Sequence, residues 1–235
     1  MRAAILEEPT TAYVNGNIIT IDPQDTIAQA MLVAGDRILA VGDTSDILAL
    51  APEGAQTVDL EGRAVIPGLI DAHVHAELTA VNQKLGVLVE IPKVETVEEV
   101  LGLIAQKARE TPEGQWIIAR GPNAMASKLK EKRLPTLEEL NRAAPHHPAA
   151  LFSAIHICVL NQLAIEKTGY WHETRLPRSS SMGRDPATGR PTGVYTELWG
   201  ARDFMMPWED KAFYQAMKEG VLDYYVTGGI TSIYE

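Results

Sequence analysis

The feature that most constrains the fold is an almost uninterrupted apolar run, Ala64–Ile70, that turns polar at Asp71-Ala72-His73-Val74-His75. Continuous apolarity predicts a strand covered on both faces, as in a parallel sheet. Side chains two positions apart in a strand share a face, so His73 and His75 should project together from the strand's end. Two neighbouring imidazoles can be two ligands of one divalent metal ion. The alternative is that both histidines are simply solvated or packed.

Before residue 65 the sequence predicts β-structure, with room for only one helical turn around Thr44–Leu50. The dipeptide Asn15-Gly16 is typical of a tight hairpin turn, here between Tyr13-Val14 and Asn17–Ile21. Further strands are expected from short segments rich in Ile and Val. These segments are Gln29–Ala34 and Arg37–Val41, joined as a second hairpin by Gly35-Asp36, and then Gln56–Leu60.

After residue 65 strand-like and helix-like segments alternate, which predicts βα units and a parallel sheet. Two helices open with the spacing of a capping box, at Thr96 with Glu99 and at Thr136 with Glu139. The other expected elements are strands at Trp116–Ala119, Ala149–Ile155 and Ile230–Tyr234, a helix at Trp208–Val226, and a long loop over 177–193. We therefore expect an α/β chain with a small β-domain at 1–65 and a second domain at 66–235.

Charge and composition exclude several classes of protein. Of the 235 residues, 21 are Lys or Arg and 31 are Asp or Glu, giving a formal net charge of −10, which argues against binding to nucleic acid or to anionic lipid. The longest stretch without formal charge, Ala143–Ile165, is too polar for a membrane helix. Cys158 is the one cysteine, so no internal disulfide framework can form. A lone thiol and the lack of an export signal near residue 1 suit the cytoplasm.

The run Pro67-Gly68-Leu69-Ile70-Asp71, with His73 and His75, resembles the amidohydrolase superfamily, whose first barrel strand typically reads P-G-[LF]-[IV]-D-x-H-x-H. The opening Val14–Thr20 also looks like the leading β-sandwich strands of that superfamily. Further matches resemble amidohydrolase family 3, the branch that contains N-substituted formamide deformylases. They include Leu134-Pro135-Thr136, Ala144-Pro145, His156, Asn161, Pro191-Thr192-Gly193-Val194, Glu197 and Gly229-Ile230-Thr231-Ser232.

The resemblance implies a partial TIM (β/α)₈ barrel preceded by a small β-sandwich domain. It also implies metal-dependent hydrolysis of a non-peptide C–N bond in an amide, a formamide or a cyclic amide, with zinc the expected ion. His73 and His75 would be metal ligands, and the catalytic aspartate of the family would lie beyond residue 235. Because a complete barrel is typically about 250 residues, we expect this chain to be a fragment or one half of a split enzyme, with weak or no hydrolysis alone.

The resemblance places His156 and Glu197 at the substrate pocket, although a core histidine and an exposed loop carboxylate are equally good interpretations. Asp71 shares the strand face of the two histidines and could orient a ligand imidazole, or it could be a plain strand-end carboxylate. Asn161 is better explained as a helix cap, Cys158 as a small buried hydrophobe, and Glu235 as a chain-end carboxylate.

Two classes of function follow. The first is the metal-dependent hydrolase, with a small amide-type substrate and with either a second copy or a complementary C-terminal chain as partner. The second is a non-catalytic remnant or interaction module that pairs with a partner chain.

Overall fold

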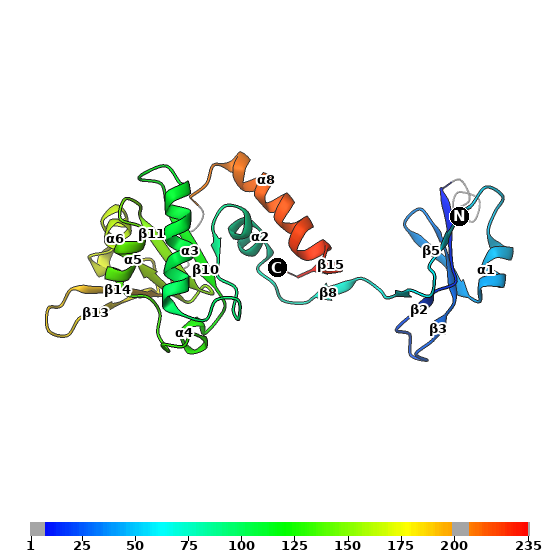
Figure 1. Cartoon of the computed structure of the whole chain (residues 1–235), viewed down its shortest axis with the longest axis horizontal. Helices are drawn as coiled ribbons and strands as arrows, with labels where there is room; N and C mark the ends of the chain where they lie inside the picture. The colour runs from blue at the N-terminus through cyan, green and yellow to red at the C-terminus, as the bar shows by residue number, and fades with distance from the viewer. Residues whose placement is uncertain (1–7, 199–206, 235) are drawn as a thin grey trace. The chain divides into compact units, whose positions relative to one another are not determined.

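A computed structural model describes residues 8–198 and 207–234, and the chain divides into two compact units, Met1–Ile70 and Asp71–Glu235. It is a mixed α/β protein (Figure 1). Within the described ranges no helix is both long and apolar enough to cross a membrane.

The first unit contains two small sheets. The larger has the order β5-β4-β1-β6, formed by Arg37–Gly42, Ala30–Ala34, Thr10–Val14 and Gln56–Asp59. The smaller has the order β3-β2-β7, formed by Ile27–Ala28, Asn17–Ile19 and Ala64–Val65. The short helix α1 (Thr44–Leu50) inserts Ile47 into a cluster with alternate residues of β1 and β4. The hairpin β4–β5 and the helical turn are as predicted.

The predicted hairpin at Asn15-Gly16 is wrong. Strand β1 pairs with β4 and β6, whereas β2 pairs with β3 and β7, so this dipeptide carries the chain from one sheet to the other. Asn15 has φ 55°, and the Gly16 N–H donates to the Gln29 carbonyl at 2.8 Å. The predicted turn needs a positive φ at both residues, and Gly16 does not have one; partners distant in sequence take the strand pairing instead.

The second unit is built on a six-stranded sheet with the order β13-β14-β12-β11-β10-β9. Strands β9 (Val87–Leu88), β10 (Ile117–Gly121) and β11 (Ala149–Ser153) are parallel. A parallel sheet was predicted, but a strand at Val87–Leu88 was not. The sheet then continues antiparallel, so the expectation of a parallel sheet holds for only part of it. The antiparallel strands are β12 (Ile157–Leu160), β14 (Pro191–Thr196) and β13 (Ser181–Arg184).

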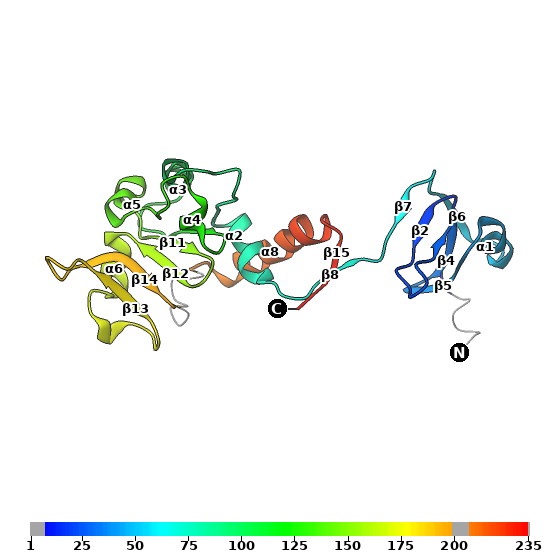
Figure 2. The ribbon, with the colours of Figure 1, turned by 90° about the horizontal axis from the view of Figure 1, so that it is seen from below.

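Helices pack on both faces of this sheet. The sheet has one hydrophobic core on each face, and successive residues of β10 point into opposite cores. Ile117 and Ala119 pack with α3 (Val97–Glu110) and α5 (Leu137–Ala143). Ile118 packs with α6 (Gln162–Thr168) on the other face. Figure 2 shows α3 and α5 side by side over the sheet. Both predicted capping boxes are present, and Asn161 caps α6 as predicted. Two further short helices are α4 (Met125–Lys128) and η2 (Glu173–Arg175).

The predicted loop over 177–193 is wrong in part, because it contains β13 and the start of β14. Ser181–Arg184 lacks the apolar alternation of a strand, yet it pairs with β14 at the edge of the sheet. The intervening turn is held by Asp185, whose Oδ1 accepts from the N–H groups of Ala187 and Thr188 at 2.9 and 2.8 Å. Such local side-chain bonds, rather than apolar pattern, stabilise this hairpin.

The last elements pack beside the start of the second unit. Helix α8 (Asp210–Gly220) continues into the π-helix η3 (Val221–Val226) and runs alongside α2 (Ala76–Lys84) (Figure 1). Strand β15 (Ile230–Ile233) pairs with β8 (Leu69–Asp71). Gly220 permits the close approach of the two helices, because a Cβ there would overlap the backbone of Ala80. Lys84 Nζ donates to Asp223 Oδ2 across the same interface.

Candidate metal centre and substrate cavity

His73 and His75 follow strand β8 instead of lying in it. The predicted buried strand over Ala64–His75 is wrong: Pro67-Gly68 separates the short strands β7 and β8, and Ile70 is 73% exposed. His75 is the residue that precedes the first turn of α2. The two imidazoles therefore lie in the loop that joins a strand to a helix.

Hydrogen bonds hold this loop at both ends. The Asp71 side chain accepts from the backbone N–H of His73 at 3.2 Å. Tyr234, beside β15, donates its N–H to the Asp71 carbonyl at 2.9 Å and accepts from the Val74 N–H at 3.1 Å. Asp71 thus fixes the backbone of the histidine loop, and its predicted contact with a ligand imidazole stays a prediction.

The two imidazole rings lie close together although they are not on a strand face. Their centroids are 5.5 Å apart and the ring planes are inclined at 79°. Two imidazoles that share one tetrahedral zinc at about 2.0–2.1 Å would have centroids about 5 Å apart. The spacing therefore fits two ligands of one ion. Among the described residues no group of three or more His, Cys, Asp and Glu side chains is placed to hold a metal.

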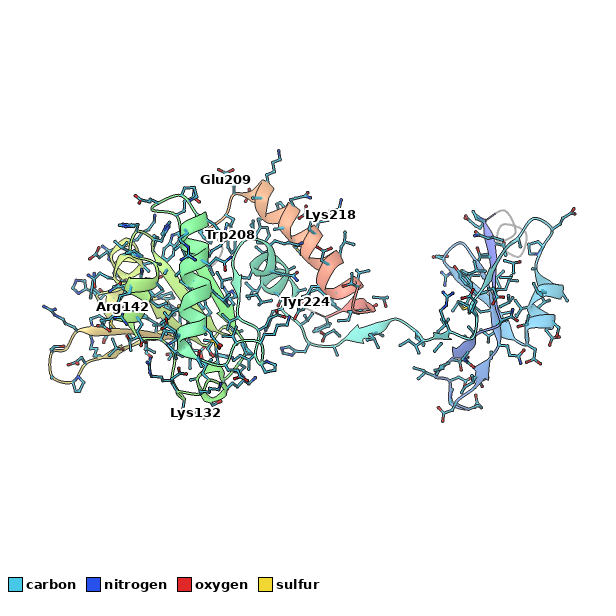
Figure 3. All side chains as sticks on the ribbon, in the orientation of Figure 1. Lys132, Arg142, Trp208, Glu209, Lys218 and Tyr224 are labelled. Atoms are coloured by element: carbon cyan, nitrogen blue, oxygen red, sulfur yellow. The ribbon has the colours of Figure 1, made fainter. Side chains whose placement is uncertain are left out.

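The histidines border a cavity of about 470 Å³ in the second unit. It opens where β9, β10 and β11 end, which is the edge at which parallel strands of α/β folds place their sites. Its wall is mostly apolar. The lining residues from these strand ends are Leu88, Val89, Glu90, Ile91, Arg120, Gly121, Pro122, Ala154 and Ile155. Leu78 and Thr79 of α2 and Tyr224 of η3, which is labelled in Figure 3, complete it with the histidine loop.

His156 and Glu197 are brought together by strand pairing. Ile157 of β12 pairs with Thr196 of β14, so the residues that flank this pair become neighbours although they are far apart in the sequence. His156 Nδ1 lies 3.0 Å from Glu197 Oε1, and the Glu197 N–H donates to the His156 carbonyl at 2.8 Å. Glu197 holds a φ of 53°, a conformation that non-glycine residues seldom adopt. His156 directly follows Ile155 in the cavity wall.

Arg120 is the cavity residue that the sequence analysis missed. Its side chain is 6% exposed, and its guanidinium carbon lies 4.2 Å from the centroid of the Phe152 ring. Burial lowers the pKa of the Arg120 side chain to about 10, so the group stays charged at neutral pH. The available signal was a charged residue directly after the apolar segment Ile117–Ala119 and directly before Gly121-Pro122.

Two other residues have structural roles, and one lies outside the described ranges. Asn161 Oδ1 accepts from the N–H groups of Ala149 and Ala164, both at 2.9 Å. Cys158 is buried, and burial raises the pKa of its thiol, as expected for a small hydrophobe and not a nucleophile. Glu235 lies outside the part of the chain that the structure describes.

The chain belongs to the amidohydrolase family, whose model matches residues 56–235. It is 36% identical to N-substituted formamide deformylase of Arthrobacter pascens over 200 residues, which are 85% of this chain and 36% of that protein. It is 27% identical to Protein LONG AFTER FAR-RED 3 of Arabidopsis thaliana over 223 residues, which are 93% of this chain and 37% of that protein. This chain therefore spans little more than a third of the length of these relatives.

The fold is also found among solved structures. A crystal structure of an uncharacterized metal-dependent hydrolase from Pyrococcus furiosus matches 95% of this chain and 43% of that one, with a TM-score of 0.59 and 21% identity. This likeness concerns the arrangement of the elements.

Proposed function

We propose that this chain carries part of the active site of a metal-dependent hydrolase that cleaves a non-peptide C–N bond, as in an amide, a formamide or a cyclic amide. The observation that carries the proposal is the pair of imidazoles, 5.5 Å apart, beside a cavity at the carboxyl ends of parallel strands. Family membership and the name of the formamide deformylase relative support the substrate class. The partial TIM barrel, the β-sandwich and the domain boundary at residue 65 belong to the same proposal.

In this proposal His73 and His75 hold a divalent ion, with zinc as the expected metal. Such an ion, when bound, would supply a water molecule of lowered pKa and would polarise the substrate carbonyl. Asp71 keeps the histidine loop in place through its bond to the His73 N–H. The apolar wall excludes water from the substrate, and the His156–Glu197 pair binds a polar substrate group at the rim.

Two imidazoles alone are too few ligands for a tight zinc site, since catalytic zinc is generally held by three protein ligands. The remaining ligands and the catalytic aspartate are therefore proposed to come from outside the described residues, from a continuation of the chain or from a complementary chain. Hydrolysis by this chain alone should be weak or absent.

Metal content tests the proposal. The purified chain should bind zinc, and His73→Ala and His75→Ala should each lower the affinity by more than the roughly 10–100-fold that a change beside a metal ligand costs. His172→Ala, at an exposed histidine elsewhere in the unit, is the matched control and should leave binding unchanged. Equal zinc binding by all four proteins would refute the metal centre.

The second candidate function is that of a non-catalytic module that binds a partner chain. Exposed apolar side chains on η3 and β15 favour it, among them Val226 at 52% and Ile233 at 42% exposure. A metal-free chain that sediments as a stable oligomer would support this module over the hydrolase.

A further inference from the structure

We propose that Arg120 is a specificity-determining residue that binds a carboxylate on the substrate, so that the amides accepted at this site carry an acidic group. This inference rests on the proposed function, because it names the substrate class of the same cavity.

The first observation is a buried cation with an incomplete set of hydrogen bonds. Nη1 of Arg120 donates to the Ala154 carbonyl at 3.4 Å. Nε and Nη2 are buried and have no hydrogen-bond partner among the described residues. Leaving donors of a charged group unsatisfied inside a protein is costly, so these two donors need an explanation, and an anionic ligand would supply one.

The second observation is the shape of the unsatisfied edge. Nε and Nη2 lie on one side of the planar guanidinium, and together they present two parallel N–H donors. This is the edge on which arginine binds a carboxylate through two parallel hydrogen bonds. Nη1, which already bonds to Ala154, lies on the other side.

The third observation is the surroundings. Arg120 lines the same cavity as His73 and His75, so its guanidinium lies beside the space that a ligand of the two histidines would occupy. The acidic residue of the wall, Glu90, accepts a hydrogen bond from Lys93 Nζ at 2.8 Å. The Phe152 ring covers one face of the guanidinium and shields it from water, which strengthens its attraction for an anion.

The unsatisfied edge is closed to solvent. A carboxylate therefore reaches it only when the atoms that cover this edge move aside. Opening this edge costs packing. An acidic substrate compensates for that cost with charged hydrogen bonds to Arg120, whereas a neutral amide has no group that does so. The closed edge therefore favours acidic substrates.

A simpler interpretation is that Arg120 only holds the turn after β11. Ala154, which accepts from Nη1, has a φ of 50°. That role requires a single donor and leaves the other edge unexplained. The two interpretations differ in a binding preference that can be measured.

The test compares two amides that differ only in a carboxylate: N-formyl-phenylalanine and N-formyl-2-phenylethylamine. Isothermal titration calorimetry on the full chain, with zinc content measured in the same samples, should give a 10–100-fold preference for the acidic amide, as expected for charged hydrogen bonds. Arg120→Met should abolish the preference, so that the two amides bind with equal affinity. Arg142→Met, at an exposed arginine of α5 that is labelled in Figure 3, should keep it.

The remaining outcomes separate the two proposals. Equal affinity for both amides in a chain whose zinc depends on His73 and His75 would overturn the role of Arg120 and leave the hydrolase proposal intact. A preference that depends on Arg120, in a chain whose zinc binding ignores the histidines, would support Arg120 and overturn the metal centre. If Arg120→Met does not fold, Arg120→Lys serves instead; it keeps the charge but not the planar edge, and should reduce the preference.

Discussion

Arg120 combines a stability cost with a site for a ligand. A buried cation without a carboxylate partner among the described residues pays a desolvation penalty that the Phe152 ring and one long hydrogen bond only partly offset. Binding sites commonly contain groups that lower the stability of the fold, and a bound ligand then provides the missing interaction partner. The same side chain should therefore affect stability and binding in opposite directions.

The first prediction concerns this cost. Arg120→Met keeps most of the side-chain volume and removes the buried charge, so it should leave the free energy of unfolding unchanged or raise it by about 1–4 kcal/mol. Urea denaturation at neutral pH measures the change. A loss of more than about 2 kcal/mol would mean that the bond to Ala154 and the ring contact stabilise the fold substantially.

Residue-level prediction from sequence succeeded where the signal was chemical and local. The spacing of His73 and His75 predicted that their rings lie close together, which is confirmed, although the reason given, a shared strand face, was wrong, since both rings lie in a loop. Their role as metal ligands stays a prediction. The resemblance placed His156 and Glu197 separately at the substrate pocket and did not predict their contact, which depends on the pairing of β12 with β14. Arg120 was missed because one charged residue after a strand is common.

At the scale of elements, the capping box of α5 is joined to an ion pair. Glu139 accepts from the Thr136 N–H at 2.8 Å, and Arg133 donates to both of its oxygens at 2.6 and 2.8 Å. The bonds from Arg133, followed by those from Thr136, lower the pKa of Glu139 from 4.5 to about 2. This element therefore carries a pH-dependent part of the stability.

The second prediction follows from the sign of that shift. A carboxyl whose pKa is lower in the folded state stabilises the fold fully above its unfolded value of 4.5, and the contribution is lost as pH falls toward about 2. Glu139→Gln should destabilise the chain by about 1 kcal/mol at pH 6, with the difference shrinking below pH 4.5. Denaturant titrations at several pH values measure it, with the exposed Glu138→Gln as control. A difference that is constant with pH would contradict the assignment.

The third prediction concerns the contact of α2 with α8. Gly220→Ala places a methyl group against the backbone of Ala80, which cannot move aside as a side chain can, so it should cost about 1–3 kcal/mol. Gly102→Ala is the matched control: it lies inside α3 with open space around it, and should stabilise by about 0.5–1 kcal/mol through helix propensity. Similar effects at both positions would show that α8 does not pack closely on α2.

Elements were predicted well where their signals are local. The capping threonines Thr96 and Thr136 fixed two helix starts because each motif is complete within four residues. The hairpin at Asn15-Gly16 and the loop at 181–184 were wrong because strand pairing is decided by distant partners. No local pattern states that β14 will pair with β12.

For the whole molecule, the alternation of strands and helices was sufficient to predict an α/β chain. It was not sufficient to predict where the parallel sheet turns antiparallel, since β12 follows β11 through the tight turn Ala154–His156 instead of a helix. The proposed boundary at residue 65 is likewise a prediction from the sequence pattern, which changes there from hairpin-like segments to alternating strands and helices.

The fourth prediction tests that boundary by limited proteolysis. Ile66–Gly68 belongs to no helix or strand, and Ile66 is 54% exposed, so this segment has few bonds that must break before a protease can bind it. Brief digestion with proteinase K should make its first cut between Val65 and Leu69, as read by mass spectrometry of the fragments. The competing site is the turn at Asp185–Arg190, which its own hydrogen bonds protect. First cuts at that turn, with 66–68 intact, would place the weakest point of the chain inside the second unit and contradict a domain boundary at residue 65.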